Sequence, residues 1–348
     1  MFSLTSTHLR FVCEATTALR LETSTFRAGQ NLRGALGQVM TRAYCAHTPT
    51  PGPSPVAKPA TGEGCPICWL LAANEHPGQE RRGYALVPPF DGQSPDVVSP
   101  GNRFEFGLTL FGSALQFLPY FVLAVPEMGR LGVGVGRGKF ALKSVWAENP
   151  FSRARECLLA EGDNLVHTPT LTMTHADVMN AASQSDLRGL RPSPLRFGGA
   201  SQDLEGLTIQ FLTPTRLIEE GKLAQAPAFD ALFARLLKRL DELAEQFGNG
   251  ARRGMDAAQS LQRVAERVRL VEQETRWVEV FSGSSRRGAA SPLSGLVGRA
   301  VYAAPPEVWS PLLPWLLWGQ LAQVGKSTVK GNGVIKVTRR LGCQSFKI

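Results

Sequence analysis

Apolar positions in the first half of the chain follow either the alternation of a strand or the spacing of a helix. Residues 9–13 alternate as in a strand, and the apolar positions within 31–44 recur at helical spacing. Residues 104–110 alternate again, 115–127 form an apolar run that predicts a buried helix, and 140–145 predict a further strand. The predicted order is β-α-β-α-β.

The second half repeats this rhythm. Its clearest element is a helix over 229–243, where leucine and phenylalanine side chains trace one face. The other predicted elements are a strand over 207–212, a helical stripe over 261–271, a strand over 277–281, a helix over 311–324 and a strand over 334–339. Two α+β halves of similar rhythm predict a duplicated ferredoxin-like fold, in which helices cover one face of an antiparallel sheet.

Length and composition divide the chain into two domains. At roughly 100 to 200 residues per domain, 348 residues suffice for two. Pro49 to Pro59 carry five prolines, which predicts an extended loop, and residues 161–205 mix polar residues with short apolar runs, as a linker does. We predict a first domain over 1–165 with a proline-rich, cysteine-containing insertion at about 45–85, a linker over 166–205, and a second domain over 206–348.

The charge balance favours a polyanionic partner. Lys and Arg total 38 against 29 Asp and Glu, which gives a net charge of +9. Nucleic acid is therefore the first candidate partner. No apolar stretch reaches the roughly 20 residues needed to span a bilayer, and the first residues lack the apolar core of a secretory signal, so we expect a cytoplasmic protein and no membrane partner.

A glycine-rich segment near the C-terminus carries basic residues. Gly325-Lys-Ser resembles part of a nucleotide-binding P-loop, but the first glycine of that motif is missing and the segment precedes a strand instead of a helix. Between Gly325 and Ile348 there are six basic residues and no carboxylate. A solvated basic tail is the alternative to phosphate binding. The candidate RNA-binding residues here are Gly325, Lys326, Ser327, Lys330, Gly331 and Gly333.

Two other basic segments resemble this one. Glycines from Gly129 to Gly138 alternate with cations, among them Arg137 and Lys139, at the matching place of the first half. The loop around Arg286 and Arg287 is also free of acids. Either segment could be an ordinary solvated loop, but the duplication strengthens the prediction of RNA binding.

The segment between Glu22 and Glu63 has no carboxylate and could hold a catalytic site. It contains Arg27, Arg33, Tyr44, His47 and Lys58. Metal-free scission of RNA needs a base near the 2′-hydroxyl, an acid for the leaving 5′-oxygen, and cations for the pentacoordinate phosphate, and these residue types provide all three. His47 could instead be a surface histidine or a metal ligand.

Three cysteines form half of a zinc-binding pattern. Cys65 and Cys68 have the Cys-x2-Cys spacing of a zinc knuckle, and Cys45 precedes them by twenty residues. A tetrahedral site would take His76 or His47 as its fourth ligand, and free buried thiols are the alternative. No Gly-x-Ser-x-Gly elbow of a serine hydrolase occurs, and the Cys-x2-Cys pair does not open a helix after a strand, as a redox site requires.

Motifs spread over nearly the whole chain resemble the CRISPR precursor-RNA processing endoribonucleases of the RAMP superfamily. The residues that carry the resemblance are Asn31-Leu-Arg-Gly-Ala-Leu-Gly37 followed by Cys45, Phe106 to Gly112, Gly132 to Phe140, Phe211 to Leu217, Leu236-Leu-Lys-Arg-Leu240, Trp277 with the following Ser/Arg-rich loop, Gly295-Leu-Val-Gly298, and Val324 to Gly333. The resemblance implies two tandem ferredoxin-like, RRM-like domains and an RNA-holding glycine-rich loop at Gly325 to Gly333. It also implies metal-independent attack of a 2′-hydroxyl on the adjacent phosphate, which leaves a 2′,3′-cyclic phosphate.

The family keeps its general base, usually a histidine, in or just after the first helix. Here that helix has no histidine, and His47 is the nearest, with Tyr44 beside it. We therefore predict an endoribonuclease that cleaves CRISPR repeat RNA, with His47 as base or acid, Tyr44 assisting, and Arg33 or Lys58 stabilising the phosphorane. It would need no cofactor for catalysis, although a structural zinc is compatible with the cysteines, and other subunits of a CRISPR effector complex are expected partners. The alternatives are a non-catalytic repeat-RNA-binding subunit of such a complex and a zinc-stabilised interaction protein.

Overall fold

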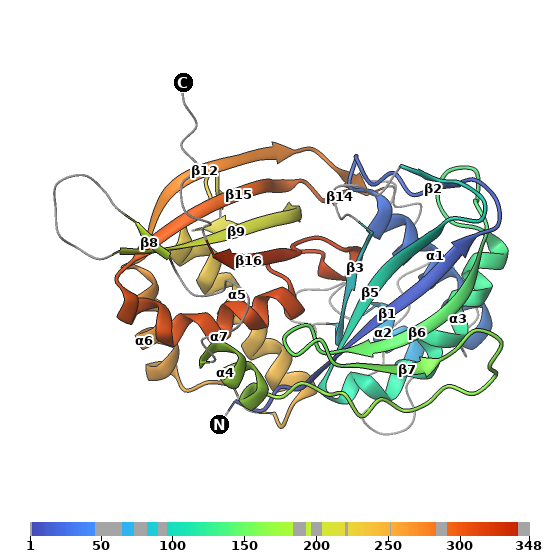
Figure 1. Cartoon of the computed structure of the whole chain (residues 1–348), viewed down its shortest axis with the longest axis horizontal. Coiled ribbons are helices and arrows are strands. Elements are labelled where there is room, and N and C mark those ends of the chain that lie inside the picture. Colours follow the sequence, from blue (N-terminus) through green and yellow to red (C-terminus); the bar gives the residue numbers. More distant parts are fainter. Residues whose placement is uncertain are drawn as a thin grey trace.

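Two antiparallel sheets lie side by side, each with its own helices (Figure 1). The computed structural model describes residues 2–45, 65–72, 82–89, 96–183, 193–195, 204–219, 222–250, 252–282 and 291–339. In Figure 1 the sheet of the first domain is on the right, and the sheet of the second domain is on the left above α5, α6 and α7. None of the helices in these ranges has the length and apolar character needed to cross a membrane.

The first domain is a ferredoxin-like unit with added short elements. Its central strand β1 lies between β5 and β6, and the sheet order is β3-β5-β1-β6-β7, with every pair antiparallel. The elements are β1 Ser6–Ala15, β2 Leu19–Arg20, α1 Ala28–Tyr44, α2 Pro66–Ala72, β3 Tyr84–Val87, β4 Val97–Val98, β5 Arg103–Phe111, the 3-10 helix η2 Gly112–Phe117, α3 Leu118–Leu131, β6 Phe140–Glu148 and β7 Arg155–Leu159.

The second domain has the same connectivity. The sheet order β12-β15-β9-β16 places the first strand, β9, between the third and fourth strands, as β1 is placed in the first domain. The elements are α4 His175–Ser183, β8 Ser193–Leu195, β9 Leu204–Thr215, β10 Ile218–Glu219, β11 Lys222–Leu223, α5 Phe229–Phe247, α6 Met255–Ala265, β12 Arg269–Val278, β13 Phe281–Ser282, β14 Ser291–Pro292, β15 Gly295–Ala304, α7 Pro306–Ala322, the 3-10 helix η3 Thr328–Lys330 and β16 Ile335–Arg339. The predicted tandem ferredoxin-like fold is confirmed.

Two predictions about the second domain are wrong in detail, and one strand was not predicted. The helical stripe over 261–271 is wrong beyond Ala265, where α6 ends, because β12 begins at Arg269. The strand expected over 277–281 falls on the end of β12 and on β13. The sequence reasoning missed β15, although this strand pairs with both β9 and β12. Glycine and alanine are frequent in β15 and give it little of the β-branched character by which strands are recognised.

The segment expected to be a linker contains a packed helix. Within residues 166–205, α4 lies against α7 of the second domain (Figure 1). Val178 on α4 is fully buried, and His175 stacks on Trp315 of α7 with ring centroids 4.8 Å apart. This part of the connection is therefore fixed to the second domain.

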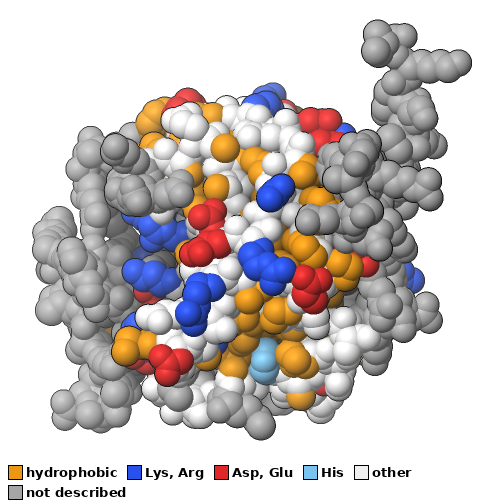
Figure 2. Space-filling view, turned by 90° about the vertical axis from the view of Figure 1, so that its left-hand side faces the viewer, with side chains coloured by type: hydrophobic (Ala, Val, Ile, Leu, Met, Phe, Trp, Pro, Cys, Tyr) orange, Lys and Arg blue, Asp and Glu red, His pale blue; other side chains and the backbone are white. Residues whose placement is uncertain are grey.

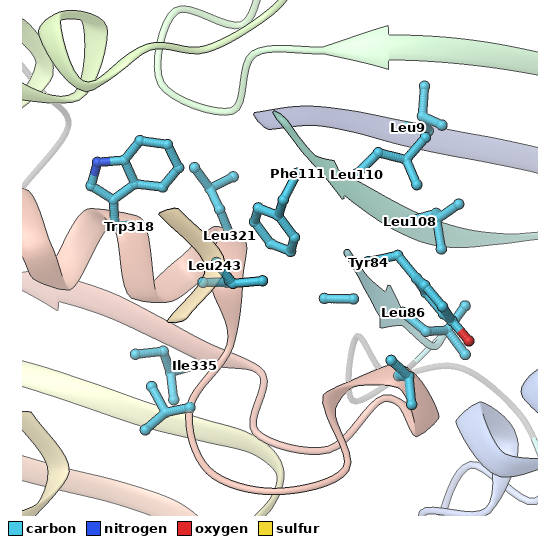
Figure 3. Close-up of a cluster of buried hydrophobic side chains, with 14 of the residues drawn as sticks. Leu9, Tyr84, Leu86, Leu108, Leu110, Phe111, Leu243, Trp318, Leu321 and Ile335 are labelled. Atoms are coloured by element: carbon cyan, nitrogen blue, oxygen red, sulfur yellow. The ribbon is translucent and has the colours of Figure 1, made fainter. Parts of the chain in front are cut away.

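The two domains share one hydrophobic core. Figure 3 shows Leu9, Leu110 and Phe111 of the first domain in the same cluster as Leu243 and Leu321 of the second. At Gly112 the backbones come so close that an added Cβ would lie 1.8 Å from the carbonyl oxygen of Phe247. Burial of apolar surface from both sides fixes the position of one domain relative to the other.

The outer face of the first sheet is occupied by internal ion pairs. Arg10 of β1 contacts Glu105 and Glu148 at 2.8 Å each, and Arg155 contacts Glu148 at 3.1 Å. Beside them His8 hydrogen-bonds Thr109 across 3.0 Å, and burial lowers the pKa of His8 to about 4, helped by the charge of Arg10. Because these charges already compensate each other, this face is a poor site for a polyanion.

Candidate functional site

The second half of the C-terminal glycine loop, residues 325–333, is inserted between the two domains. An added Cβ on Gly29, in the first turn of α1, would lie 2.2 Å from the carbonyl oxygen of Lys330. An added Cβ on Gly331 would lie 2.8 Å from the ring of Pro88, which follows β3. Just before the loop, the side-chain amide of Gln323 donates a 2.7 Å hydrogen bond to the carbonyl of Leu86. The loop is thus held against the start of α1.

Glycines and internal hydrogen bonds give this loop its shape. Ser327 and Gly331 flank η3, both with left-handed backbone angles, φ 65° and 81°. Gly333 donates from its N–H to the carbonyl of Pro214, and Asn332 donates from its side chain to the carbonyl of Leu293. Gly331 and Gly333, which the sequence suggested as RNA contacts, are buried against protein and have positive φ angles of 81° and 79°.

The junction gives a prediction with a matched control on the same helix. Gly29→Ala should destabilise the protein by about 1–3 kcal/mol, because its methyl group would overlap the Lys330 backbone and the well-packed junction would have to move. Gly34→Ala, where nothing lies within 4 Å of the new methyl group, should stabilise α1 by up to about 1 kcal/mol. Urea unfolding of both variants measures the difference, and equal stabilities would show that α1 and the loop are not in tight contact.

Three cations lie close enough at this junction for the charges of two of them to act on the third. Lys330 of η3 is half-buried, and burial lowers its pKa, as do the charges of Arg33 on α1 and Arg82 before β3. The Nη2 of Arg33 donates to the carbonyl of Leu71 at 3.2 Å. No carboxylate in the described part of the chain forms an ion pair with Arg33 or Lys330. We call Arg33, Arg82 and Lys330 the junction cations.

The basic glycine loop of the first domain lies at the same end of α1. It forms a tight turn, in which Val133 and Gly138 exchange backbone hydrogen bonds of 2.9 and 3.1 Å. An added Cβ on Gly134 would lie 3.6 Å from the side-chain amide of Asn31 in α1. Arg137 and Lys139 are exposed on this loop. The glycine loop of the first domain connects α3 to β6, and that of the second domain connects α7 to β16, which are the matching positions expected from the sequence. Both loops contact the start of α1.

Arg27 and Tyr44 lie at opposite ends of α1. Arg27 caps its start, is exposed, and lies 3.8 Å from Glu22. Tyr44 ends it, half-buried, with its ring edge-on to Tyr120 at 5.6 Å between centroids. Arg33 and Tyr44 are eleven positions apart, about 16 Å along the helix axis at ~1.5 Å per residue. The charge of Arg33 acts on Lys330, while Tyr44 lies at the other end of the helix. Other predicted residues, His47, Lys58, His76, Arg286 and Arg287, lie outside the described residues.

The three predicted cysteine ligands come together beyond the end of α1. Cys45 follows α1 directly, while Cys65 and Cys68 lie at the start of α2. The Sγ atom of Cys45 is 3.5 Å from that of Cys68 and 3.7 Å from that of Cys65. Zn–S bonds of about 2.3 Å at tetrahedral angles place ligand sulfurs about 3.8 Å apart, so this spacing fits three ligands of one zinc. The cluster could hold a metal ion.

Cations at the opposite end of the second domain are not gathered in the same way. Figure 2 shows that face with basic, acidic and apolar side chains interspersed.

Arg82, which completes the junction cations, was missed by the sequence reasoning, because it follows a segment with no periodic pattern. Only the spatial approach of β3 to η3 brings it to Lys330.

Comparison with known families separates the two halves. Residues 4–171 match a family model described as an N-terminal domain. Residues 209–335 match the model of the CRISPR-associated endoribonuclease Cas6. The chain carries a Cas6 domain. This match, which includes the whole C-terminal glycine loop, confirms the predicted class, an RNA-cleaving enzyme of the CRISPR type.

Solved structures agree with the Cas6 domain assignment at the level of the fold. Cas6 from Thermus thermophilus superposes with a TM-score of 0.52 at 13% identity, covering 96% of this chain and 99% of that one. A chain of a partial Cas6-RT-Cas1–Cas2 complex superposes with a TM-score of 0.57 at 12% identity, covering all of this chain and 49% of that one. No curated protein sequence matches the chain.

Proposed function

We propose that this protein binds CRISPR repeat RNA and cleaves it at the junction between α1 and the C-terminal glycine loop. The reaction would be attack of a ribose 2′-hydroxyl on the adjacent phosphate, which expels the 5′-oxygen and leaves a 2′,3′-cyclic phosphate, with no metal ion taking part. The observation that carries the proposal is the set of junction cations, because they meet where the Cas6 domain contacts the first helix.

The junction suits the charge that develops in this reaction. The phosphorane carries more negative charge than the phosphodiester, and fixed cations in a partly desolvated place stabilise that extra charge more strongly than cations in water. The lowered pKa of Lys330 brings its titration closer to neutrality. Lys330 can therefore serve as a cation and as a proton donor to the leaving oxygen. Exposed Arg27, Arg137 and Lys139 at the same end of α1 would bind flanking phosphates.

We propose a structural role for the three cysteines. Bound to zinc with His76 or His47, they would fasten the end of α1 to α2 and thereby support the helix that carries Arg33. Tyr44 adjoins this cluster, about 16 Å from Arg33, so we place it in support of α1 and not in contact with the reacting phosphate.

The test is incubation of the purified protein with its cognate repeat RNA in the presence of EDTA. We expect cleavage, with products that carry a cyclic phosphate and a 5′-hydroxyl. Binding without cleavage would indicate a repeat-RNA-binding subunit instead of a nuclease. The absence of both binding and cleavage would refute the proposal.

A His47→Ala variant locates the base. A rate that falls by about 100- to 10,000-fold assigns the role to His47, whereas a rate within about threefold of wild type excludes it.

A further inference from the structure

The first half of the C-terminal glycine loop borders a pocket in the second domain that is distinct from the junction. Among the described residues its lining comprises five cations, a glycine and an isoleucine, and no carboxylate: Arg216, Ile218, Arg235, Lys238, Arg239, Gly325 and Lys326. The pocket has a volume of about 40 Å³, on a measure by which one water needs roughly 10–15 Å³. It therefore has room for a group of a few heavy atoms, such as a phosphate, and not for a base or a nucleoside.

The protein backbone fixes the cations in place. Arg235 donates from Nε to the carbonyl of Ile218 at 2.7 Å, and Arg239, 5% exposed, donates from Nε to the carbonyl of Ala322 at 2.6 Å. Gly325, with φ +90°, lies so close to Arg216 that an added Cβ would be 2.7 Å from the Arg216 carbonyl oxygen. These contacts join β9, α5 and the loop around one small space.

Four of the five cations that line the pocket have no ion-pair partner among the described residues: Arg216, Arg235, Lys238 and Lys326. The nearest acidic neighbour shown by the pocket linings is Asp230, which lines an adjoining hollow together with Arg235 and Lys238. Within the same part of the chain, no acceptor takes the backbone N–H of Gly325 or Lys326. Cations and free amides around one small space are the donors that bind phosphate.

We propose that this pocket binds one phosphate group, and that in the working protein this is a backbone phosphate of the RNA that the C-terminal glycine loop holds. The inference rests on the proposed function for the source of the phosphate, but not for the chemistry of the pocket. Lys326 and Lys330 then serve different phosphates, because Lys326 lines this pocket while Lys330 faces Arg33 across the junction. The pocket would hold the RNA in register without touching the scissile bond.

The experiment compares Lys238→Gln/Lys326→Gln with Arg252→Gln. Lys238 and Lys326 are exposed, so their replacement should leave the fold intact, which thermal melting checks. Arg252 is an exposed cation beyond the far end of α5. RNA affinity is measured against salt concentration. The slope of log K against log salt is negative, and losing one phosphate contact should make it less steep by about 0.7 to 0.9 in the double variant. The control should keep the wild-type slope.

A second arm uses inorganic phosphate and a nucleoside 5′-monophosphate as probes. If the salt dependence of RNA binding changes in Lys238→Gln/Lys326→Gln but not in Arg252→Gln, the occupant of the pocket is a phosphate of the RNA. If the wild type binds no RNA, the proposed function fails, but the pocket is still tested: inorganic phosphate should raise the melting temperature of the wild type and not that of Lys238→Gln/Lys326→Gln. That result would assign the pocket to a free phosphate. An unchanged RNA slope together with no phosphate-dependent stabilisation overturns the pocket as a phosphate site.

Discussion

Replacing Lys330 by alanine should slow the cleavage of repeat RNA by about 100- to 1,000-fold, the usual effect of removing one group that stabilises an oxyanion. The reason is that Lys330 meets Arg33 and Arg82 at the junction, where a phosphorane would be surrounded by fixed cations. RNA affinity should fall much less, because a polyanion is held by many phosphate contacts. Single-turnover cleavage and filter binding measure the two effects separately.

Two further variants distinguish a chemical role of Lys330 from a structural one. Because burial and the neighbouring arginines lower its pKa, wild-type Lys330 loses its charge as pH rises through that lowered pKa, and the rate should fall with it. Lys330→Arg keeps the positive charge, so the cleavage rate of this variant should not change over the same pH range. Lys336→Ala, an exposed lysine on β16, serves as the control and should cleave at the wild-type rate. A Lys330→Ala enzyme with wild-type cleavage would move the reaction away from the junction.

Cys65→Ser should remove one equivalent of zinc from the protein and lower its stability. The three sulfur atoms have the spacing of a tetrahedral site, and the ion would link the end of α1 to α2. Where free zinc exceeds the dissociation constant by 100- to 1,000-fold, its loss amounts to about 3–4 kcal/mol. Elemental analysis gives the zinc content, and thermal melting with and without a chelator gives the stability.

The matched control is Cys157→Ser. Cys157 lies on β7, outside the cysteine cluster, and should keep both the zinc and the melting temperature. Less than a tenth of an equivalent of metal in freshly purified wild-type protein would show that the three cysteines are free thiols. In that case the chelator should also leave the melting curve unchanged.

Periodicity predicted the elements whose buried and exposed faces differ clearly. The helix over 229–243 became α5, and the alternation at 104–110 became β5, because each turns one apolar face to the core. The pattern failed at β12, most of whose residues are half-buried or exposed, so that Val268 and Val271 fit a helical spacing equally well. The central strand β15 is recognised by its pairing with β9 and β12 and not by its own residues.

The candidate site was predicted in parts but not as an assembly. Glycines and lysines between 325 and 333 drew attention to the C-terminal loop, and the absence of acids drew attention to Arg33. The contact between domains brings Lys330 under the influence of Arg33, packing within the second domain places Lys326 and Arg216 at one pocket, and Tyr44 packs against Tyr120 instead. The pocket that Arg235, Lys238 and Arg239 of α5 share was not predicted, because it depends on the fold.

The shared core has a consequence for how tightly RNA can be held. A loop that had to find α1 only after RNA arrived would lose conformational freedom at that moment, and the affinity would be lower by that amount. Here Phe111, Leu243 and Leu321 join the domains through the shared core, and Gly29 packs against the backbone of Lys330. The ordering cost of this part of the binding surface is incurred during folding, so the free energy of RNA contacts there appears as affinity.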